Sequence, residues 1–268
     1  MLDKSKVEKI LSGKATIIAI LVVLVAAGIY SAIGSKGAEP AAAATNKSAN
    51  SQEIESIIAK WVAENPDKII ESVVKMQQKT MQDQQKNAQQ SISAKQNEIF
   101  NNPNDPVHAP AGYDVTIAEF FDYNCGYCKR AGKTVEKLIA EDKKVRIIFK
   151  ELPILGASSA ELSKVSIAVN LMDKSKYVAF HKALMASSAR SQGDALKVAK
   201  KIGLNVEKLK ATLKNKAAEI EKQIQENQAL AGSVGINGTP AFVIGAELIP
   251  GAVDIGTLKS MIEKARKK

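Results

Sequence analysis

Cysteine, histidine and tryptophan are scarce in this chain of 268 residues, which has two, two and one of them. A structural zinc site normally needs four cysteine or histidine ligands, and the histidines, His108 and His181, stand far apart in the sequence. A protease of the cysteine type would need a histidine base, and neither histidine has a recognisable context for that role. We therefore expect no resident metal and no cofactor.

Aromatic residues make up only 4% of the chain, although its formal net charge is +10. Such a charge is a hint of nucleic-acid binding, but the known binding modules combine basic side chains with aromatic ones. Here the lysines are spread along helical patterns in which acidic residues also recur, as in 133–144 and 206–223. The composition therefore predicts a solvated basic surface and no nucleic-acid partner.

Residues 15–35 contain no charged side chain and are almost wholly apolar. A helix needs about 20 such residues to cross a bilayer. Four lysines lie in 1–14, which predicts that this end stays in the cytoplasm and that the rest is exported. An inner-membrane anchor is favoured over a cleaved signal peptide, whose apolar core usually has about 7 to 15 residues, but cleavage stays open. Either way we expect the cysteines in the periplasm or cell envelope, an oxidising environment.

Two segments of different composition precede the main domain. Residues 36–52 are small and polar, which is typical of a flexible linker. Residues 53–100 place apolar side chains at helical spacing, with a break at Asn65 and Pro66. Because the apolar stripe is too thin to bury against itself, we expect this region to form a dimer or trimer with copies of the chain. A helix lying on its own domain and a disordered spacer are the alternatives.

Residues 104–268 read as one α/β domain. The strand patterns lie at 113–123, 145–154, 240–245 and 247–251, and the helical patterns at 129–144, about 157–235 and 255–268. The first strand, helix and second strand form a βαβ unit with a parallel pair and a right-handed crossover. The expected fold is a small mixed sheet with an inserted helical block, preceded by a helical N-terminal extension.

Both cysteines lie in the motif CGYC, as Cys125 and Cys128, where the first strand ends and the next helix begins. Free N–H groups and the positive end of the helix dipole favour a thiolate there, and Lys129 and Arg130 add positive charge nearby. Cys128, one helical turn later, is expected to be more buried. This arrangement suits thiol–disulfide exchange, in which Cys125 attacks and Cys128 resolves the mixed disulfide.

The C-x-x-C at a strand-to-helix junction, the helical insertion and Thr239-Pro240 before a strand together resemble the DsbA-like branch of the thioredoxin superfamily. The resemblance covers roughly 104–268, and with the membrane and helical segments it extends to suppressor-of-copper-sensitivity and disulfide isomerase-like members. It implies a thioredoxin-like fold with an inserted helical domain. It also implies that Pro240 is cis and packs beside the cysteines, and that the backbone of Thr239 pairs with a bound peptide.

The same resemblance implies two further site residues. The family has an acidic residue six positions before the first cysteine and a lysine on the next strand, and Glu119 and Lys150 match those places. Buried near a thiol, such a pair would move protons during exchange and tune the cysteines. Glu119 would otherwise be a costly charge in the core of a strand.

Two positions depart from the strongly oxidising members of that family. The residues between the cysteines are Gly126-Tyr127 rather than Pro-His, so no imidazolium stands beside Cys125. Thr239 resembles the isomerase-like members, because typical oxidases have valine before the cis proline. The first departure favours a less acidic Cys125 and a less oxidising centre, and the second favours isomerase-like activity.

We therefore predict a thiol–disulfide oxidoreductase that acts on exported cysteine-containing proteins, is recycled by a membrane redox partner and isomerises disulfides as an oligomer. A monomeric-type dithiol oxidase is one alternative. A non-catalytic envelope protein with a structural disulfide is another, although a bond that closes a four-residue loop restrains the unfolded chain little. A disulfide that resists reduction by glutathione would favour that last alternative.

Overall fold

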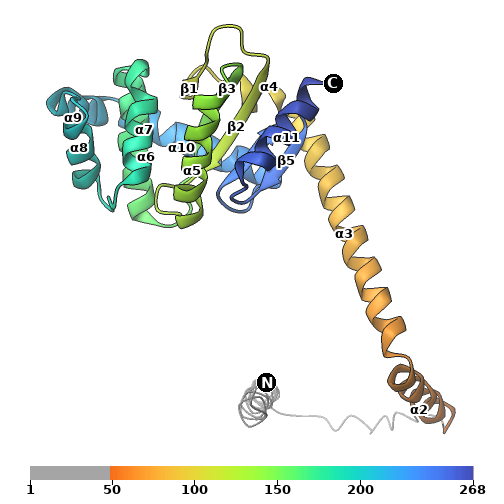
Figure 1. Ribbon diagram of the computed structural model, residues 1–268. Coiled ribbons are helices and arrows are strands. Elements are labelled where there is room, and N and C mark those ends of the chain that lie inside the picture. Colours follow the sequence, from red (N-terminus) through yellow and green to blue (C-terminus); the bar gives the residue numbers. More distant parts are fainter. Residues whose placement is uncertain (1–48, 268) are drawn as a thin grey trace, which may run out of the picture. The chain divides into compact units, whose positions relative to one another are not determined.

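A computed structural model of the protein describes residues 49–267 (Figure 1). The predicted cytoplasmic segment 1–14, the predicted membrane segment 15–35 and most of the linker 36–52 lie outside the described residues. Within the part that the structure describes, no helix combines the length and the apolar character needed to cross a membrane. The chain divides after Pro66 into two compact units.

The described part of the first unit is helix α2 (Ala49–Glu64). Its apolar side chains recur every three or four residues and are 42–60% exposed: Ile54, Ile57, Ile58, Trp61 and Val62. The helix ends at Asn65, whose side-chain amide and backbone N–H both donate to the carbonyl of Trp61 (2.8 and 2.9 Å). The helix therefore carries an exposed apolar stripe along its length.

The second unit is built around a five-stranded mixed sheet of order β1-β3-β2-β4-β5. The strands are β1 (Val107–His108), β2 (Val115–Phe121), β3 (Val145–Glu151), β4 (Ala241–Ile244) and β5 (Glu247–Pro250). β2 and β3 are parallel, as the βαβ pattern predicts, and the other neighbouring strands are antiparallel. The sequence pattern did not reveal β1, which lies in a segment that contains three prolines, 101–112.

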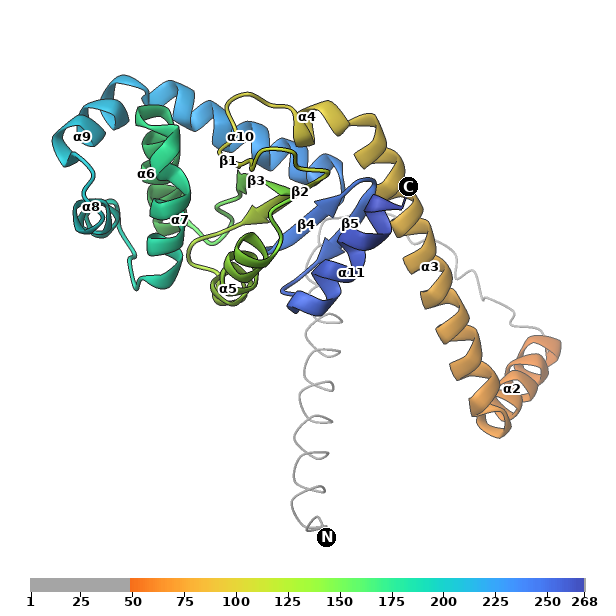
Figure 2. The same ribbon diagram turned by 45° about the horizontal axis from the view of Figure 1, so that its top comes forward.

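Helices cover both faces of this sheet (Figure 2). α5 (Gly126–Glu141) and α11 (Ile255–Arg266) lie on one side, and α4 (Gln96–Phe100) and α10 (Ala217–Ser233) lie on the other. The inserted helical block also contains α6 (Ala157–Met172), the short 3-10 helix η1 (Lys174–Lys176), α7 (Tyr177–Ala186), α8 (Gln192–Lys201) and α9 (Val206–Asn215). The predicted α/β class with a helical insertion is confirmed.

The two faces of the sheet bury two different cores. Residues of β2 alternate between them, so that Ile117 and Phe121 enter the core that holds both cysteines, whereas Ala118 and Phe120 enter the other. The first core is closed by α5, α11 and the inserted helices, and the second by α4 and α10. A side chain on β2 or β3 can therefore reach the cysteines only from one of its two faces.

The packed domain begins before residue 104, the predicted boundary. The end of α3 (Pro66–Ala94) and all of α4 belong to it, because Ile92, Ile99 and Phe100 are buried against the sheet. The single helix expected over 67–100 is broken at Lys95. The earlier apolar side chains of α3 are 38–62% exposed: Ile69, Ile70, Val73, Val74, Met76 and Met81.

Candidate redox site

Cys125 and Cys128 lie at the start of α5, immediately after β2 and its following loop. Cys125 is the N-cap residue, and its carbonyl accepts the N–H of Lys129 at 3.1 Å. The exposed fraction is 8% for Cys125 and 0% for Cys128, and both thiols are free. The structure thus places the first cysteine outward and the second inward, as expected for an attacking and a resolving thiol.

The loop before β4 closes over the first cysteine. The peptide bond between Thr239 and Pro240 is cis, as the resemblance implies. The thiol of Cys125 donates to the backbone carbonyl oxygen of Thr239, with 3.3 Å between sulfur and oxygen. A cavity of about 320 Å³ lies along this loop and is lined by residues that include Gly238 and Pro250. The structure therefore brings Cys125, Cys128, Thr239 and Pro240 together.

Asp122, a buried carboxylate that the sequence pattern did not single out, holds the loop before the first cysteine. Its Oδ1 accepts the N–H of Asn124 (2.7 Å), and its Oδ2 accepts those of Ile154 and Leu155 (2.9 and 3.0 Å). Its own N–H lies 3.5 Å from the sulfur of Cys128. An acidic residue inside an apolar run, three positions before a cysteine, was the signal that could have identified it.

Positive charge reaches this loop from an unexpected part of the chain. The ammonium of Lys129 donates to a backbone carbonyl after α7 at 2.5 Å, and the guanidinium of Arg130 lies 4.3 Å from the centre of the Tyr127 ring. Arg190, in the loop before α8, donates to the side-chain oxygen of Asn124 at 2.5 Å. The inserted helices therefore supply a cation directly beside the residue that precedes the first cysteine.

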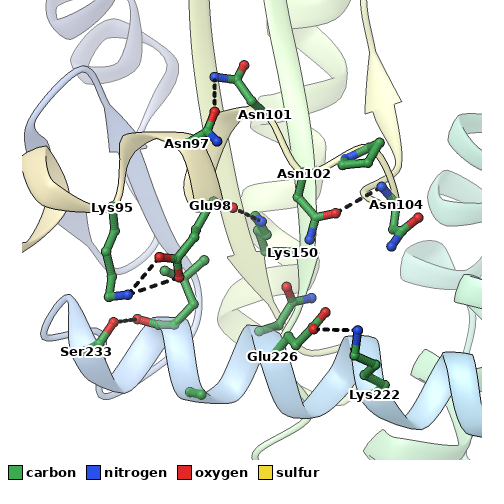
Figure 3. Close-up of a pocket in the computed structure, with 14 residues that line it drawn as sticks. Lys95, Asn97, Glu98, Asn101, Asn102, Asn104, Lys150, Lys222, Glu226 and Ser233 are labelled. Carbon is green, nitrogen blue, oxygen red and sulfur yellow. Dashed lines mark hydrogen bonds and ion pairs between the residues drawn. The ribbon is translucent and has the colours of Figure 1, made fainter.

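The expected pairing of Glu119 with Lys150 is wrong. In the parallel register of β2 and β3, Glu119 stands beside Phe149, so Lys150, the next residue, projects to the opposite face. Its ammonium lies 2.5 Å from Asp105 Oδ2. It also donates to the carbonyl of Glu98 at 2.7 Å, a contact drawn in Figure 3. The strand register, which depends on contacts far apart in sequence, separates these two residues.

Lys150 belongs to a different part of the domain. It lines a cavity of about 700 Å³ whose walls come from α4, the loop after it and α10 (Figure 3). Neither cysteine lines this cavity. Of the predicted site residues, Lys150 is therefore the one that the structure does not bring to the thiols.

A second buried acid, Glu151, occupies the face of the sheet toward which Glu119 projects. Glu151 lies two residues after Phe149 on β3, and both acidic side chains have no exposed surface. Glu151 Oε1 accepts the hydroxyl of Tyr177 at 2.9 Å, whereas neither oxygen of Glu119 has a hydrogen-bond partner among residues 49–267. Burial raises the pKa of each carboxyl to about 8, and the charge of Glu151 adds to the rise at Glu119.

The surroundings of Cys128 disfavour its thiolate. Burial raises the pKa of this thiol far above its ordinary value, and the neighbouring Cys125 and Glu119 raise it further when charged. Hydrogen bonds from the backbone of Asp122 and the side chain of Thr239 act in the opposite direction but are outweighed. The inner thiol therefore reacts readily only if a nearby group accepts its proton.

Next to these carboxyls lies a buried polar group that the sequence did not reveal. The hydroxyl of Tyr123 is 2.6 Å from Ser166 Oγ and 3.0 Å from His181 Nδ1. Burial lowers the pKa of His181 to about 3, so the ring is neutral at physiological pH. Over the described range 49–267, no three histidine, cysteine or acidic side chains are grouped as metal ligands would be.

A C-x-x-C at a helix N-terminus, a facing cis-proline loop and a mixed sheet with a helical insertion define a thioredoxin-like redox domain. The chain belongs to the DsbA-like thioredoxin family, because the model of the DsbA-like thioredoxin domain matches residues 116–263, more than half of the chain.

Solved structures agree with this assignment. A thioredoxin-like oxidoreductase from Silicibacter pomeroyi DSS-3 is 39% identical, covers 64% of this chain and 98% of that one, and has a TM-score of 0.60. The catalytic domain of Proteus mirabilis ScsC is 29% identical over 67% of this chain and 99% of that one, with a TM-score of 0.61. BcfH from Salmonella enterica Typhimurium is 26% identical over 85% of this chain and 100% of that one, with a TM-score of 0.70. The last match extends into the helical region before the domain.

The curated relatives are longer proteins. The Na(+)/H(+) antiporter NhaA 1 of Salinispora arenicola is 23% identical over 162 residues, which are 60% of this chain and 24% of the antiporter. This chain therefore spans about a quarter of the length of that relative, and the similarity concerns a part of it only.

Proposed function

We propose that the protein is an exported thiol–disulfide oxidoreductase in which Cys125 exchanges disulfides with cysteine-containing proteins and Cys128 resolves the mixed disulfide. The observation that carries the proposal is the placement of the two thiols. The outer one lies at a helix N-terminus against the Thr239 carbonyl, and the inner one is buried a single turn away. A helix N-terminus stabilises the attacking thiolate.

The chemistry follows from this placement. The Cys125 thiolate attacks one sulfur of a substrate disulfide, and the other substrate sulfur leaves as a thiolate. If a second substrate thiolate attacks the mixed disulfide, the substrate leaves with a rearranged disulfide and the protein stays reduced. If Cys128 attacks instead, the substrate leaves reduced and the protein becomes oxidised.

We further propose that isomerisation is the main activity and depends on self-association through α2 and the first part of α3. The exposed apolar side chains of both helices support this proposal, since burying them against other copies would remove them from water. An oligomer would present several Cys125 thiols to one substrate. It would also keep an oxidising membrane partner from the site, while a reducing one maintains the thiolate.

We also propose a cellular location for the protein. The apolar run 15–35 and the lysines before it support a domain held on the periplasmic side of the inner membrane, or released there after cleavage.

Dithiol oxidation is the second candidate function, and it is favoured by the completeness of the site. Residues 67–267 supply both cysteines and the cis-proline loop without a second copy.

A scrambled-disulfide substrate tests the function directly. We expect the reduced full-length protein to restore native disulfides, Cys125→Ala to be inactive, and Cys128→Ala to accumulate covalent complexes visible on non-reducing gels. Activity of Cys125→Ala equal to that of the unaltered protein would overturn the proposal. A disulfide that does not equilibrate with glutathione would do the same and favour a structural bond.

A further inference from the structure

The side chain that shares the buried face with Glu119 is a second carboxyl rather than a lysine. Neighbouring strands are about 4.8 Å apart and residues rise about 3.3 Å along each, so the Cα atoms of Glu119 and Glu151 are roughly 8 Å apart on a diagonal. Both side chains enter the core that contains the cysteines, since their strand neighbours Ile117 and Phe149 do so. The charge of Glu151 raises the pKa of Glu119, so the two carboxyl groups are near enough to interact.

No cation in the part of the chain that the structure describes compensates this pair. The titratable groups that face it from the packed elements are Asp122 and Tyr123 after β2, Cys125 and Cys128 at the start of α5, and Tyr177 and His181 of α7. α6 contributes only the hydroxyls of Ser163 and Ser166. Within residues 49–267, neither carboxyl forms an ion pair with a lysine or arginine.

We propose that Glu151 is a positioning residue of the redox site, which acts through Glu119 to set the pH at which Glu119 can accept the proton of Cys128. Two neighbouring carboxyl groups cannot both ionise easily in a core without water. As the pH rises, one of them therefore loses its proton before the other does. The hydroxyls of Ser166, Tyr177 and Ser163 stabilise the resulting negative charge on Glu151. While Glu151 holds it, Glu119 keeps its own proton and cannot act as a base.

The step that this pair controls rests on the exchange reaction proposed above. The sulfur of Cys128 forms a bond with the sulfur of Cys125, and the bond between Cys125 and the substrate sulfur breaks. The substrate sulfur leaves with the electron pair as a thiolate, and the proton of the Cys128 thiol passes to a carboxylate oxygen of Glu119. In the reverse direction the protonated Glu119 returns that proton to Cys128.

A purely structural role does not account for Glu151. Its neighbours include the hydroxyls of Ser166 and Ser163 besides that of Tyr177. A glutamine would accept the same bond from Tyr177 and would carry no ionisable group into the core, where burying a charge is costly. The carboxyl therefore offers something that an amide would not, which is a charge beside Glu119.

An aromatic disulfide reagent allows the reactions of the two thiols to be followed one after the other. Each molecule of the reduced full-length protein releases one coloured thiolate when Cys125 attacks the reagent and a second when Cys128 resolves the adduct. We expect Glu151→Gln to move the pH midpoint of the second release down by about one unit or more, the scale of coupling between paired carboxyls. The first release should keep its pH profile, and Glu151→Asp should restore the midpoint toward that of the unaltered protein.

Asp105→Asn is the matched control, because it makes the same change at a buried carboxyl on the opposite face of the sheet. It should leave the second release unchanged. A Glu151→Gln profile that superimposes on that of the unaltered protein, or that moves together with the first release, overturns the proposal.

The Asp105→Asn protein, in which both glutamates are unaltered, gives an independent test if Glu151→Gln does not fold. It lacks the third buried carboxyl, whose pKa burial raises to about 6, so the infrared carbonyl band of its buried protonated carboxyls should disappear in two steps as the pH rises, because coupled groups titrate separately. A single step overturns the pairing. Absence of a second thiolate release from the unaltered protein would instead overturn the exchange function, and the infrared titration would still report on the carboxyls.

Discussion

The sulfur of Cys125 lies 3.3 Å from the backbone carbonyl oxygen of Thr239, a residue 114 positions later in the chain. The antiparallel pairing of β2 with β4 produces this contact, because the first strand leads into the cysteine loop and the second begins just after Pro240. A peptide strand that pairs with the backbone at Thr239 would therefore bring its own sulfur beside the reactive thiol.

The side chain of Thr239 provides the first prediction. Its hydroxyl hydrogen-bonds Cys128 and partly offsets the burial of that thiol. Thr239→Val keeps the shape but removes the bond, so we expect resolution of the mixed disulfide to slow by roughly three- to tenfold, the net worth of one hydrogen bond. Thr239→Ser keeps the hydroxyl and should retain the rate. The second thiolate release of the aromatic disulfide assay measures both, and equal slowing by valine and serine would contradict the role of the hydroxyl.

Asp122 provides a second prediction, on stability as well as rate. Asp122→Ala removes the acceptor of three backbone N–H groups and leaves them unsatisfied at about 1–3 kcal/mol each where they stay buried. We expect a clear fall in the urea midpoint and slower attack by Cys125, because the loop that positions it loses its anchor. Asp122→Asn keeps one acceptor oxygen, so its urea midpoint and its rate of attack should lie between those of the alanine variant and the unaltered protein. An alanine variant as stable as the unaltered protein would show that the loop is held by other contacts.

Much of the fold could be predicted because its signals are local. The β-branched and aromatic runs at 113–123 and 145–154 indicate buried strands, and the cysteine motif between them marks a helix N-terminus. Thr239-Pro240 adds a family signature that needs no knowledge of packing. The division of the thiols into outer and inner also follows from their spacing along one helix.

The missed features depend on contacts between distant segments. Which face Lys150 takes is decided by strand register, and a shift of one residue reverses it. The hydrogen bond from Arg190 to Asn124 joins two segments 66 positions apart, so the local sequence around either residue does not predict it. No glycine or proline marks the break at Lys95, where the chain turns to bury Phe100 against the sheet.

The buried acids predict a stability that falls as the pH rises. Glu119 and Glu151 have a pKa of about 8 in the folded protein against an ordinary value of 4.5, so the folded state keeps protons that the unfolded state releases. Their contribution is complete below about pH 4.5 and is lost on the way to about pH 8. His181, whose pKa is lowered to about 3 from 6.5, acts oppositely, and its contribution declines below about pH 6.5.

Urea unfolding at a series of pH values tests this expectation. Between about pH 6 and about pH 9 the free energy of unfolding should fall by on the order of 1–3 kcal/mol, and the double variant Glu119→Gln/Glu151→Gln should lose most of that slope. Glu64→Gln, which removes the carboxyl of a side chain that is 62% exposed, should keep that slope. A slope that survives in the double variant would assign the pH dependence to other groups.

The exposed stripe of α2 predicts an oligomer that a single charge can break. Ile57 is 60% exposed, and Ile57→Glu would place a carboxylate in an apolar contact, where burying an unpaired charge is costly. We expect a smaller mass by sedimentation at equal concentration and a loss of isomerase activity, with dithiol oxidation retained. Ser56→Glu adds the same charge one position away, off the apolar stripe, and should change neither. An unaltered mass for Ile57→Glu would show that α2 does not join the copies.

Tyr127 lies between the cysteines and tests what sets the oxidising strength of the site. Its ring is largely exposed, and the guanidinium of Arg130 lies over it, 4.3 Å from the ring centre. This contact orients the ring, but the tyrosine side chain itself carries no charge. Tyr127→His would put an ionisable imidazole at the helix N-terminus beside Cys125. A cation there stabilises the thiolate of the reduced form and therefore makes the oxidised form more oxidising.

We expect Tyr127→His to raise the reduction potential by about 30 mV or more, which is a tenfold change in the equilibrium with glutathione. Alkylation of the free thiols after equilibration in glutathione buffers measures it directly. Tyr127→Phe keeps the aromatic ring over which Arg130 lies and adds no charge, so its potential should equal that of the unaltered protein. If phenylalanine raised the potential as much as histidine, the tyrosine hydroxyl rather than the missing cation would control the site, because the hydroxyl is all that phenylalanine removes.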